Sequence, residues 1–214
     1  MRHTLILLTF FSLLASCNTT DTDKVSTDTT LKQQTDTAKK DRQILIKELK
    51  RFQTVIASND KEKIADLFNF PISNETVGIY IDDSTFNAQL DQNGNKVTRA
   101  MFIRFYRDIS ESLQIEQINQ MFKKLNVDYL LQRDTLNHEA IIKTEPCFHY
   151  YGVTVENNLV TLTLGMNSNE DYKSKSVSED EIPENDSSIC EHVLWWKFTF
   201  DGKKLKLKEI SGAG

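Results

Sequence analysis

The amino-acid sequence predicts an α+β domain in which N-terminal helices pack on a mostly antiparallel sheet. Three observations predict it. Apolar residues recur at helical spacing over residues 41–125, strand-like alternation takes over after Pro146, and an Asp201-Gly202 turn joins two alternating runs near the C-terminus. A chain of 214 residues that is 39% hydrophobic suits one folded domain, expected over residues 41–214.

The composition excludes several classes of protein. The net charge is −5 and no basic tract occurs, whereas nucleic-acid binding needs a clustered positive surface. Three cysteines are too few for a disulfide-rich scaffold. Neither a glycine-rich phosphate loop nor a G-x-S-x-G motif is present. We therefore expect no nucleic-acid partner and no cofactor, and we assign no metal site, although the Cys-x-His pattern discussed below keeps zinc as one interpretation.

Residues 1–16 are expected to form a secretory signal peptide. Arg2 supplies the positive charge, and Leu5–Leu14 is an apolar core too short to span a bilayer. The segment Leu14-Ala15-Ser16-Cys17 resembles the lipobox of bacterial lipoproteins, which implies cleavage before Cys17 and acylation of that residue. The alternative is an ordinary signal peptide that contains a cysteine. With acylation the partner is a bacterial membrane, and the domain lies in the periplasm or at the cell surface.

Residues 17–40 are predicted to be a flexible tether. Thr, Asp, Lys and Gln dominate this segment, and apolar residues are almost absent. Such a segment cannot bury enough surface to offset the entropy lost on ordering.

The helical half of the domain is predicted from two kinds of signal. A first helix runs from Asp41 to Ser58, with an apolar stripe at Leu45, Leu49, Phe52 and Ile56. A second helix is expected to be capped by Asn59 and to stop before Pro71. Thr98 is expected to cap a third, and a fourth carries Ile115, Ile118, Phe122 and Leu125. Between them, Thr76–Asp82 and Ser84–Asp91 are strand candidates that close at an Asn93-Gly94 turn.

The sheet half is predicted from alternation of apolar and polar residues. Residues 129–143 give a weak edge strand, and Cys147–Val155 and Leu159–Met166 give two stronger ones around a turn. The last hairpin spans Ile189–Ile210. Its first strand places six residues on the face to be buried: Cys190, His192, Leu194, Trp196, Phe198 and Phe200. Trp195 and Lys197 are expected on the opposite face, and Glu209 is the first carboxylate expected on the buried face.

This order of elements resembles the nuclear-transport-factor-like domain, also called the cystatin-like α+β roll. The resemblance covers residues 41–214 and includes DKEKIADLFNFPI after the first helix and LWWKFTFDGKKLKLKEI near the C-terminus. It implies a curved sheet that wraps the helices as a cone-shaped roll with a pocket at its open end. Members of the superfamily include isomerases, cyclases and many proteins without catalytic activity, and they often pair through the outer face of the sheet. A homodimer through that face is therefore one expectation.

A repeated Cys-x-His pattern is the one constellation that suggests chemistry. Cys147 and His149 share a strand face, as do Cys190 and His192, and the two strands flank the Leu159 strand. Three interpretations stay open: a Cys147–Cys190 disulfide, two unpaired thiols, or a zinc site made by all four residues. Strands that are second neighbours lie about 9.6 Å apart. A disulfide therefore needs one cysteine outside the regular ladder.

A pocket is expected to be lined by residues from the helices and the inner strand faces: Phe102, Tyr106, His149, Tyr151, His192 and Trp196. No catalytic constellation is evident in this set, so no catalytic residue is assigned. The favoured function is a non-catalytic binding or accessory module for a small ligand or a protein. The alternatives are a small acid–base enzyme of the isomerase or cyclase kind and a structural subunit of an envelope assembly. Two converging titratable groups would favour the enzyme, and an interior filled by Phe and Leu would favour the structural subunit.

Overall fold

The computed structural model describes residues 27–142, 145–169 and 190–214, with side chains from Lys39 onward. The chain divides into two units, Met1–Asp36 and Thr37–Gly214, and the second is close to the predicted domain of residues 41–214. In the first unit only residues 27–36 are described, and they are helical. The predicted signal peptide and Cys17 lie outside the described residues. No helix in the described part of the chain combines the length and the apolar character needed to cross a bilayer.

The first helix, α1 (Thr27–Ala57), is longer than predicted. Its buried stripe is the expected one, Leu45, Leu49, Phe52 and Ile56. However, residues 27–40, predicted as part of the flexible tether, belong to the helix. Apolar periodicity detects only the part of a helix that packs, so it gave no signal for residues 27–40, where Thr, Asp, Lys and Gln dominate.

Five strands form an open antiparallel meander: β3 (Thr135–Ala140), β4 (Cys147–Glu156), β5 (Leu159–Ser168), β6 (His192–Phe200) and β7 (Leu205–Ala213). Each strand pairs with its neighbours in the sequence, so the order is β3-β4-β5-β6-β7, and β3 is not paired with β7. The predicted α+β class is therefore confirmed, with helices packed against an antiparallel sheet that does not close. The edge strand is shorter than expected, because Leu130 and Leu131 belong to a 3-10 helix, η1 (Val127–Leu131), and Ile141 and Ile142 are exposed.

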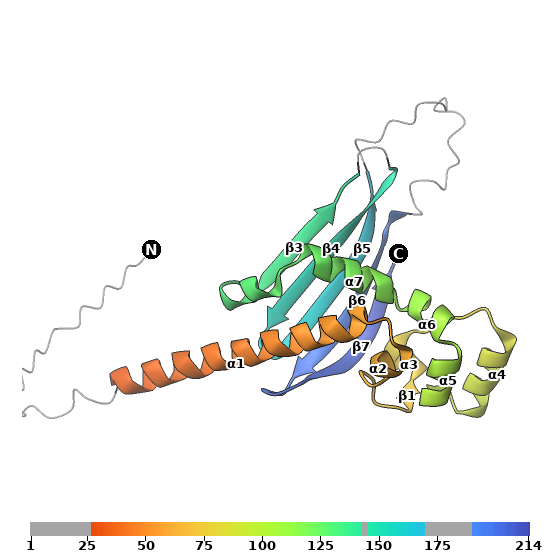
Figure 1. Ribbon diagram of the computed structural model, residues 1–214, viewed down its shortest axis with the longest axis horizontal. Helices are drawn as coiled ribbons and strands as arrows, with labels where there is room; N and C mark the ends of the chain where they lie inside the picture. The colour runs from red at the N-terminus through yellow and green to blue at the C-terminus, as the bar shows by residue number, and fades with distance from the viewer. Residues whose placement is uncertain (1–26, 143–144, 170–189) are drawn as a thin grey trace, which may run out of the picture. The chain divides into compact units, whose positions relative to one another are not determined.

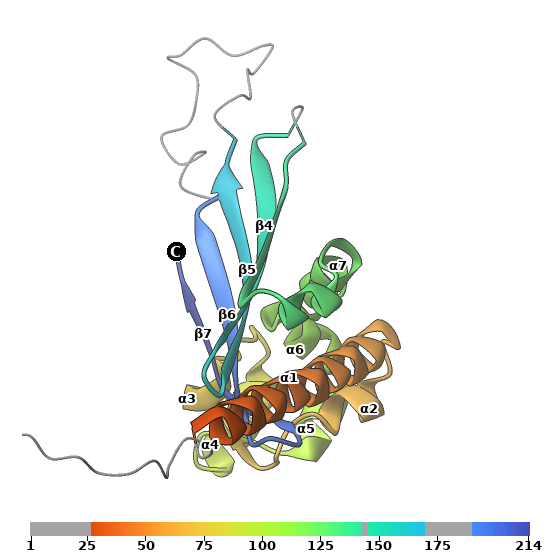
Figure 2. The ribbon, with the colours of Figure 1, turned by 90° about the vertical axis from the view of Figure 1, so that its left-hand side faces the viewer.

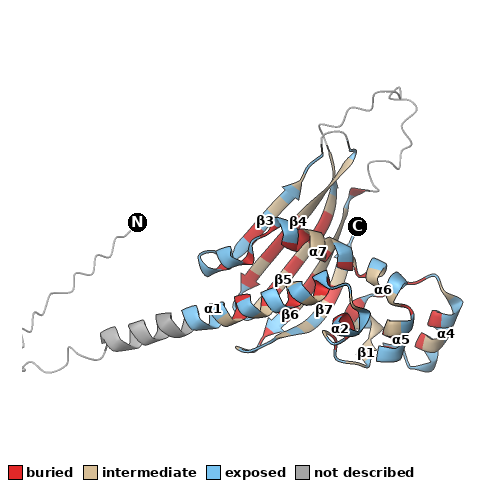
Figure 3. Cartoon of the chain, viewed as in Figure 1, coloured by how far each residue is buried: buried red, intermediate tan, exposed pale blue. Residues whose placement is uncertain are grey.

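Helices α1 and α7 (Ile115–Lys124) cross the same face of the sheet, here called the inner face (Figures 1 and 2). The ring of Phe52 on α1 lies 6.2 Å from that of Trp196 and 5.3 Å from that of Phe198. Trp196 is 1% exposed while Lys197 points to the other face, so the predicted strand register is confirmed. Figure 3 shows the buried strand residues beneath these helices and the half-buried ones toward the beginning of β4.

A β-bulge in the last hairpin changes which face Glu209 occupies. Lys197 pairs with Glu209 but Phe198 pairs with Leu207, so Lys208 is an extra residue in β7. An extra residue reverses the alternation beyond it. Leu205 and Leu207 therefore share the inner face with Ile210, and Glu209 lies outside, where its carboxylate accepts from Lys197 at 2.6 Å. The expectation that Glu209 faces the core is wrong for this reason.

The segment between the second and third predicted helices, residues 72–97, differs most from the predicted elements. Ser84–Gln92 forms helix α4 and not a strand, because Asp83 accepts a hydrogen bond from the Phe86 amide at 2.8 Å and Phe86 and Leu90 are buried four residues apart. The predicted strand Thr76–Asp82 is also wrong, since helix α3 (Asn74–Val77) and irregular chain replace it. Two short strands, β1 (Ile72–Ser73) and β2 (Lys96–Val97), pair there instead.

The remaining helices follow the prediction with changed boundaries. Helix α2 (Lys61–Ala65) is capped by Asp60, which accepts from the amides of Glu62 and Lys63, and not by Asn59. Asn59 adopts a positive φ of 47°, which is typical of a residue that follows the end of a helix, so it terminates α1 and does not begin α2. Thr98 caps the third predicted helix as expected, and this helix breaks at Phe105 into α5 (Arg99–Arg104) and α6 (Tyr106–Ser112).

Candidate functional site

The six residues predicted to line a pocket fall into two separate groups. Phe102 on α5 and Trp196 on β6 are each 1% exposed and belong to the core. The ring of Phe68 lies between them, 5.0 Å from Phe102 and 5.9 Å from Trp196. The Trp196 indole Nε1 donates to the backbone carbonyl of Leu113 at 3.2 Å. These residues fill the interior, so they are not pocket walls.

Tyr106 joins α6 to the loop before α2. Its hydroxyl donates to Asn59 Oδ1 at 3.0 Å, and its ring lies 6.0 Å from that of Phe102. Partial burial, followed by the nearby Asp60 carboxylate, raises the pKa of Tyr106. A hydroxyl that is held by an amide oxygen and kept protonated has a structural role here.

His149, Tyr151 and His192 lie on the inner face near the beginning of β4. His149 and His192 both pair with Met166 of β5, one from each side. His138 pairs with Tyr151, so all three histidines of the domain share this surface, here called the histidine face. His138 was not among the predicted pocket residues, although Leu136 and Ala140, two positions away on either side, are apolar and indicate its face.

Two residues of the histidine face, His149 and Tyr151, contact each other through their rings. His149 stacks on Tyr151 with ring centroids 6.2 Å apart, while the Tyr151 hydroxyl donates to Gln117 Oε1 at 2.9 Å. Burial, then the neighbouring His192, lowers the pKa of His149, and a hydrogen bond to the Gly165 backbone opposes this. Burial and then the Glu116 carboxylate raise the pKa of Tyr151. General acid–base chemistry needs a base and a donor within hydrogen-bond reach of one substrate atom, and here the Tyr151 hydroxyl is hydrogen bonded to Gln117.

The Cys-x-His constellation resolves as a disulfide. Cys147 and Cys190 are bonded, with their Cα atoms 5.6 Å apart. Cys147 begins β4, whereas Cys190 precedes β6 and lies outside the regular ladder, as a disulfide between second-neighbour strands requires. The interpretation with unpaired thiols is therefore wrong. The interpretation as a Cys2His2 zinc site is also wrong for the disulfide-bonded protein, because the two sulfurs are bonded to each other and are not free thiolate ligands. Among the described residues, no three His, Cys, Asp or Glu side chains are arranged to hold a metal ion.

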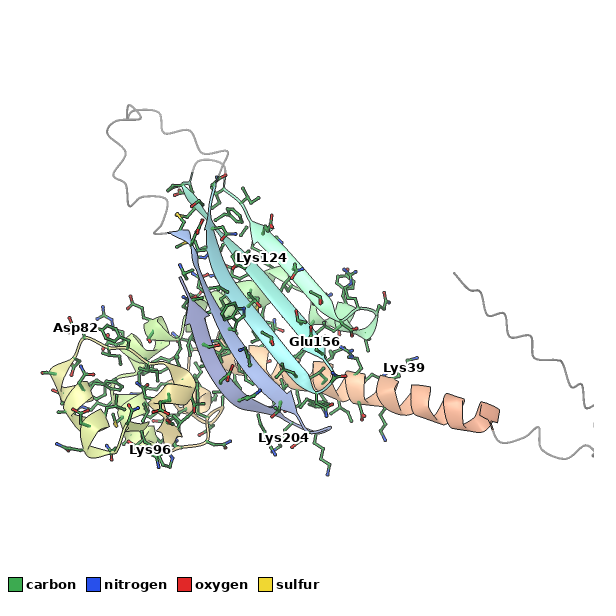
Figure 4. All side chains as sticks on the ribbon, turned by 180° about the vertical axis from the view of Figure 1, so that it is seen from behind. Lys39, Asp82, Lys96, Lys124, Glu156 and Lys204 are labelled. Atoms are coloured by element: carbon green, nitrogen blue, oxygen red, sulfur yellow. A yellow bond between two sulfur atoms is a disulfide. The ribbon has the colours of Figure 1, made fainter. Side chains whose placement is uncertain are left out.

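The outer face of the sheet carries a half-buried apolar strip that consists of Phe148, Tyr150, Val193 and Trp195. In Figure 4 the sheet is seen from this side, with α1 behind it. The Tyr150 ring lies across Gly165, where an added methyl would come within 2.0 Å of Tyr150 Cζ. We call this set the outer aromatic strip.

An ion pair lies beside the outer aromatic strip at Trp195. Lys197 Nζ is 5.9 Å from the centroid of the Trp195 ring and 2.6 Å from Glu209 Oε1. The hydrogen bond from Lys197 lowers the pKa of the Glu209 carboxyl. An aromatic centre with a charged, solvated rim is the anatomy of many protein–protein interfaces.

Two cavities lie at the opposite end of the strands from the histidine face. One of about 420 Å³ is lined by residues that include Arg42 of α1, Asn157 of the β4–β5 turn and Phe200 of β6. Another of about 300 Å³ lies between Lys39, Arg42 and Arg133. Arg42 pairs with Asp134, and its Nη1 atom is buried without a partner among the described residues. None of the six predicted pocket residues lines either cavity.

No protein-family model, curated protein or solved structure matches the chain. The resemblance to the nuclear-transport-factor-like domain therefore depends on element order and the two quoted sequence segments.

Proposed function

We propose that this protein is a bacterial lipoprotein, anchored through acylated Cys17, whose folded domain is a non-catalytic binding module outside the cytoplasm. The observation that carries this proposal is the disulfide between Cys147 and Cys190. Disulfides persist in oxidising compartments and are rare in the cytosol. The lipobox-like segment that ends at Cys17 supports the same compartment independently.

Binding is favoured over catalysis by two features of the inner face. Aromatic rings fill the space beneath the helices, as the contacts of Phe68 with Phe102 and Trp196 show. His149 and Tyr151 are stacked and not hydrogen bonded to each other, so the acid–base enzyme has no support from the described residues. A filled interior also leaves a small-molecule ligand without a pocket there, which favours a protein as the partner.

The contact surface in this proposal is the outer aromatic strip. Tyr and Trp side chains bury a large area at a low entropic cost, and a rim such as Lys197 and Glu209 excludes water around them. The partner is then either another protein of the cell envelope or a second copy of this chain. The second case agrees with the pairing through the sheet that the nuclear-transport-factor-like resemblance implies. A structural subunit of an envelope assembly would use the same face, and the filled interior favours it in the same way.

Two measurements test the proposal. Mass spectrometry of protein purified from the native envelope should find acylated Cys17 and a bonded Cys147–Cys190 pair. A Cys17 sulfur without a thioether-linked lipid would contradict the anchor, and free thiols at Cys147 and Cys190 would contradict the compartment.

The contact surface is tested by a photoreactive amino acid placed at Trp195. It should give a discrete crosslinked product in cells, either of dimer mass or with one partner. The control position is Tyr80, which is 83% exposed and lies outside the sheet. The outer aromatic strip is refuted as the contact surface if the two positions give the same products.

A further inference from the structure

Four segments that are far apart in the sequence meet at the end of the domain where the N-terminal chain enters. They are residues 39–42 of α1, residues 131–134 after η1, the β4–β5 turn at 156–158 and the β6–β7 loop and strand start at 201–206. The two cavities described above join them, since Arg42 lines one with Asp201 and Gly202 and the other with Arg133. Lys39, Glu156 and Lys204 lie at this end in Figure 4. We call it the entry end.

The entry end is positively charged although the chain as a whole is acidic. Its four segments contain seven Lys and Arg residues and four Asp and Glu residues, whereas the net charge of the whole chain is −5. Two of the cations are paired, Arg42 with Asp134 and Lys206 with Asp201. The other five have no carboxylate partner within the part of the chain that the structure describes: Lys39, Lys40, Arg133, Lys203 and Lys204. All five are exposed.

Exposed apolar side chains accompany these cations. Tyr129 is 52% exposed and Leu131 is 47% exposed, both on η1. The Arg133 guanidinium lies 5.2 Å from the centroid of the Tyr129 ring. Leu131 lines a cavity with Lys39 and Arg42. Basic groups with interspersed Tyr and Leu are suited to the headgroup region of a bilayer, where the ring or the aliphatic chain enters the interface and the charges meet phosphates.

We propose that the entry end docks on a lipid surface that contains anionic headgroups, with Lys39, Lys203 and Lys204 as its main electrostatic contacts. The proposal rests on the proposed anchor at Cys17, because the N-terminal segment that would carry the anchor joins the domain at Thr37, next to Lys39. An anchored chain keeps its domain at a high effective concentration near the membrane, so a weak electrostatic attraction suffices for docking. Each cation near an anionic surface contributes about a fivefold gain in partitioning.

The test uses the chain from Asn18 onward, which carries no acyl group and keeps every buried core residue, the first of which is Leu45. Its binding is measured by flotation with vesicles of phosphatidylcholine alone and of phosphatidylcholine mixed with phosphatidylglycerol. The variant Lys39→Gln/Lys203→Gln/Lys204→Gln should bind the anionic vesicles about 100-fold more weakly.

A matched control removes the same number of exposed charges elsewhere, as Lys96→Gln/Lys123→Gln/Lys124→Gln. It should change binding by no more than about twofold, since charges beyond a Debye length of the surface are screened. Circular dichroism of both variants checks that each is folded.

Equal binding to the two kinds of vesicle, or equal weakening by the two triple variants, would overturn docking at the entry end. That outcome says nothing of acylation, because the probe lacks Cys17. Mass spectrometry of the native protein tests the anchor separately, so the two proposals fail in distinguishable ways.

Discussion

The Cys147–Cys190 disulfide should stabilise the domain chiefly by restricting the unfolded chain. The two cysteines are 43 positions apart in the sequence, and the closure entropy of a loop of that length corresponds to about 4 kcal/mol at room temperature. Single domains are typically stable by only about 5–15 kcal/mol. We therefore expect Cys147→Ala/Cys190→Ala to lose a large part of the free energy of unfolding.

Urea unfolding followed by tryptophan fluorescence measures this loss, because Trp196 is buried in the folded domain. In the chain from Asn18 onward these two are the remaining cysteines. Three samples should be compared: oxidised protein, protein reduced with a thiol reagent, and the double variant. The reduced protein and the double variant should unfold at similar urea concentrations, both well below the oxidised protein. A double variant within about 1 kcal/mol of the oxidised protein would refute the closure argument.

Three further predictions follow from packing, electrostatics and capping. Trp196→Ala should cost about 3–5 kcal/mol because it empties a buried site, whereas Trp195→Ala on the outer face should cost about 1 kcal/mol or less; equal shifts of the urea midpoint would contradict the assigned faces. An NMR titration should show that the pKa of His149 is below its ordinary value, and His192→Asn should raise this pKa by removing a neighbouring charge. Since the unfolded chain binds the proton first, stability should fall as the pH drops below about 6.5, and His149→Asn should reduce that slope; a normal titration of His149 would refute this. Asp83→Ala should lower the free energy of unfolding by about 1 kcal/mol because it removes the cap of α4, and Asp83→Asn should lower it less. Thermal unfolding of the two variants measures the difference, and equal midpoints would contradict the role of Asp83 as a cap.

The parts of the fold that could be predicted are those with a local, periodic signal. Strand alternation located β4, β5 and β6, and it placed Trp196 inside because a period of two assigns each residue to a face. Helical spacing located the buried stripe of α1 through Phe52 for the same kind of reason. The α+β class follows from these segments alone.

The errors occur where a local signal is short or where one residue changes the register. Ser84–Gln92 has few apolar residues, so its pattern fits a strand or a helix, and the Asp83 cap decides in favour of the helix. The bulge at Lys208 depends on how β7 meets β6, and it moved Glu209 to the outer face. The predicted pocket residues lie in two places because the sequence pattern gives the face of a side chain but not its position along the sheet. Only the packing of the helices on the strands determines which of these side chains come into contact.

The sequence by itself determined the α+β class, the meander of strands, the inward position of Trp196 and the expectation of an acylated Cys17. It left the chemistry of Cys147 and Cys190 open, because their pairing depends on where Cys190 lies relative to the end of the ladder. Only the tertiary structure decided in favour of the disulfide. The basic entry end is a second such case. No tract of the sequence is basic, but residues 39–42 and residues 201–206 each carry two more cations than carboxylates. They lie together where the chain enters the domain, since the turns of an antiparallel meander return to the same end of the sheet and Arg42 lines a cavity with Asp201.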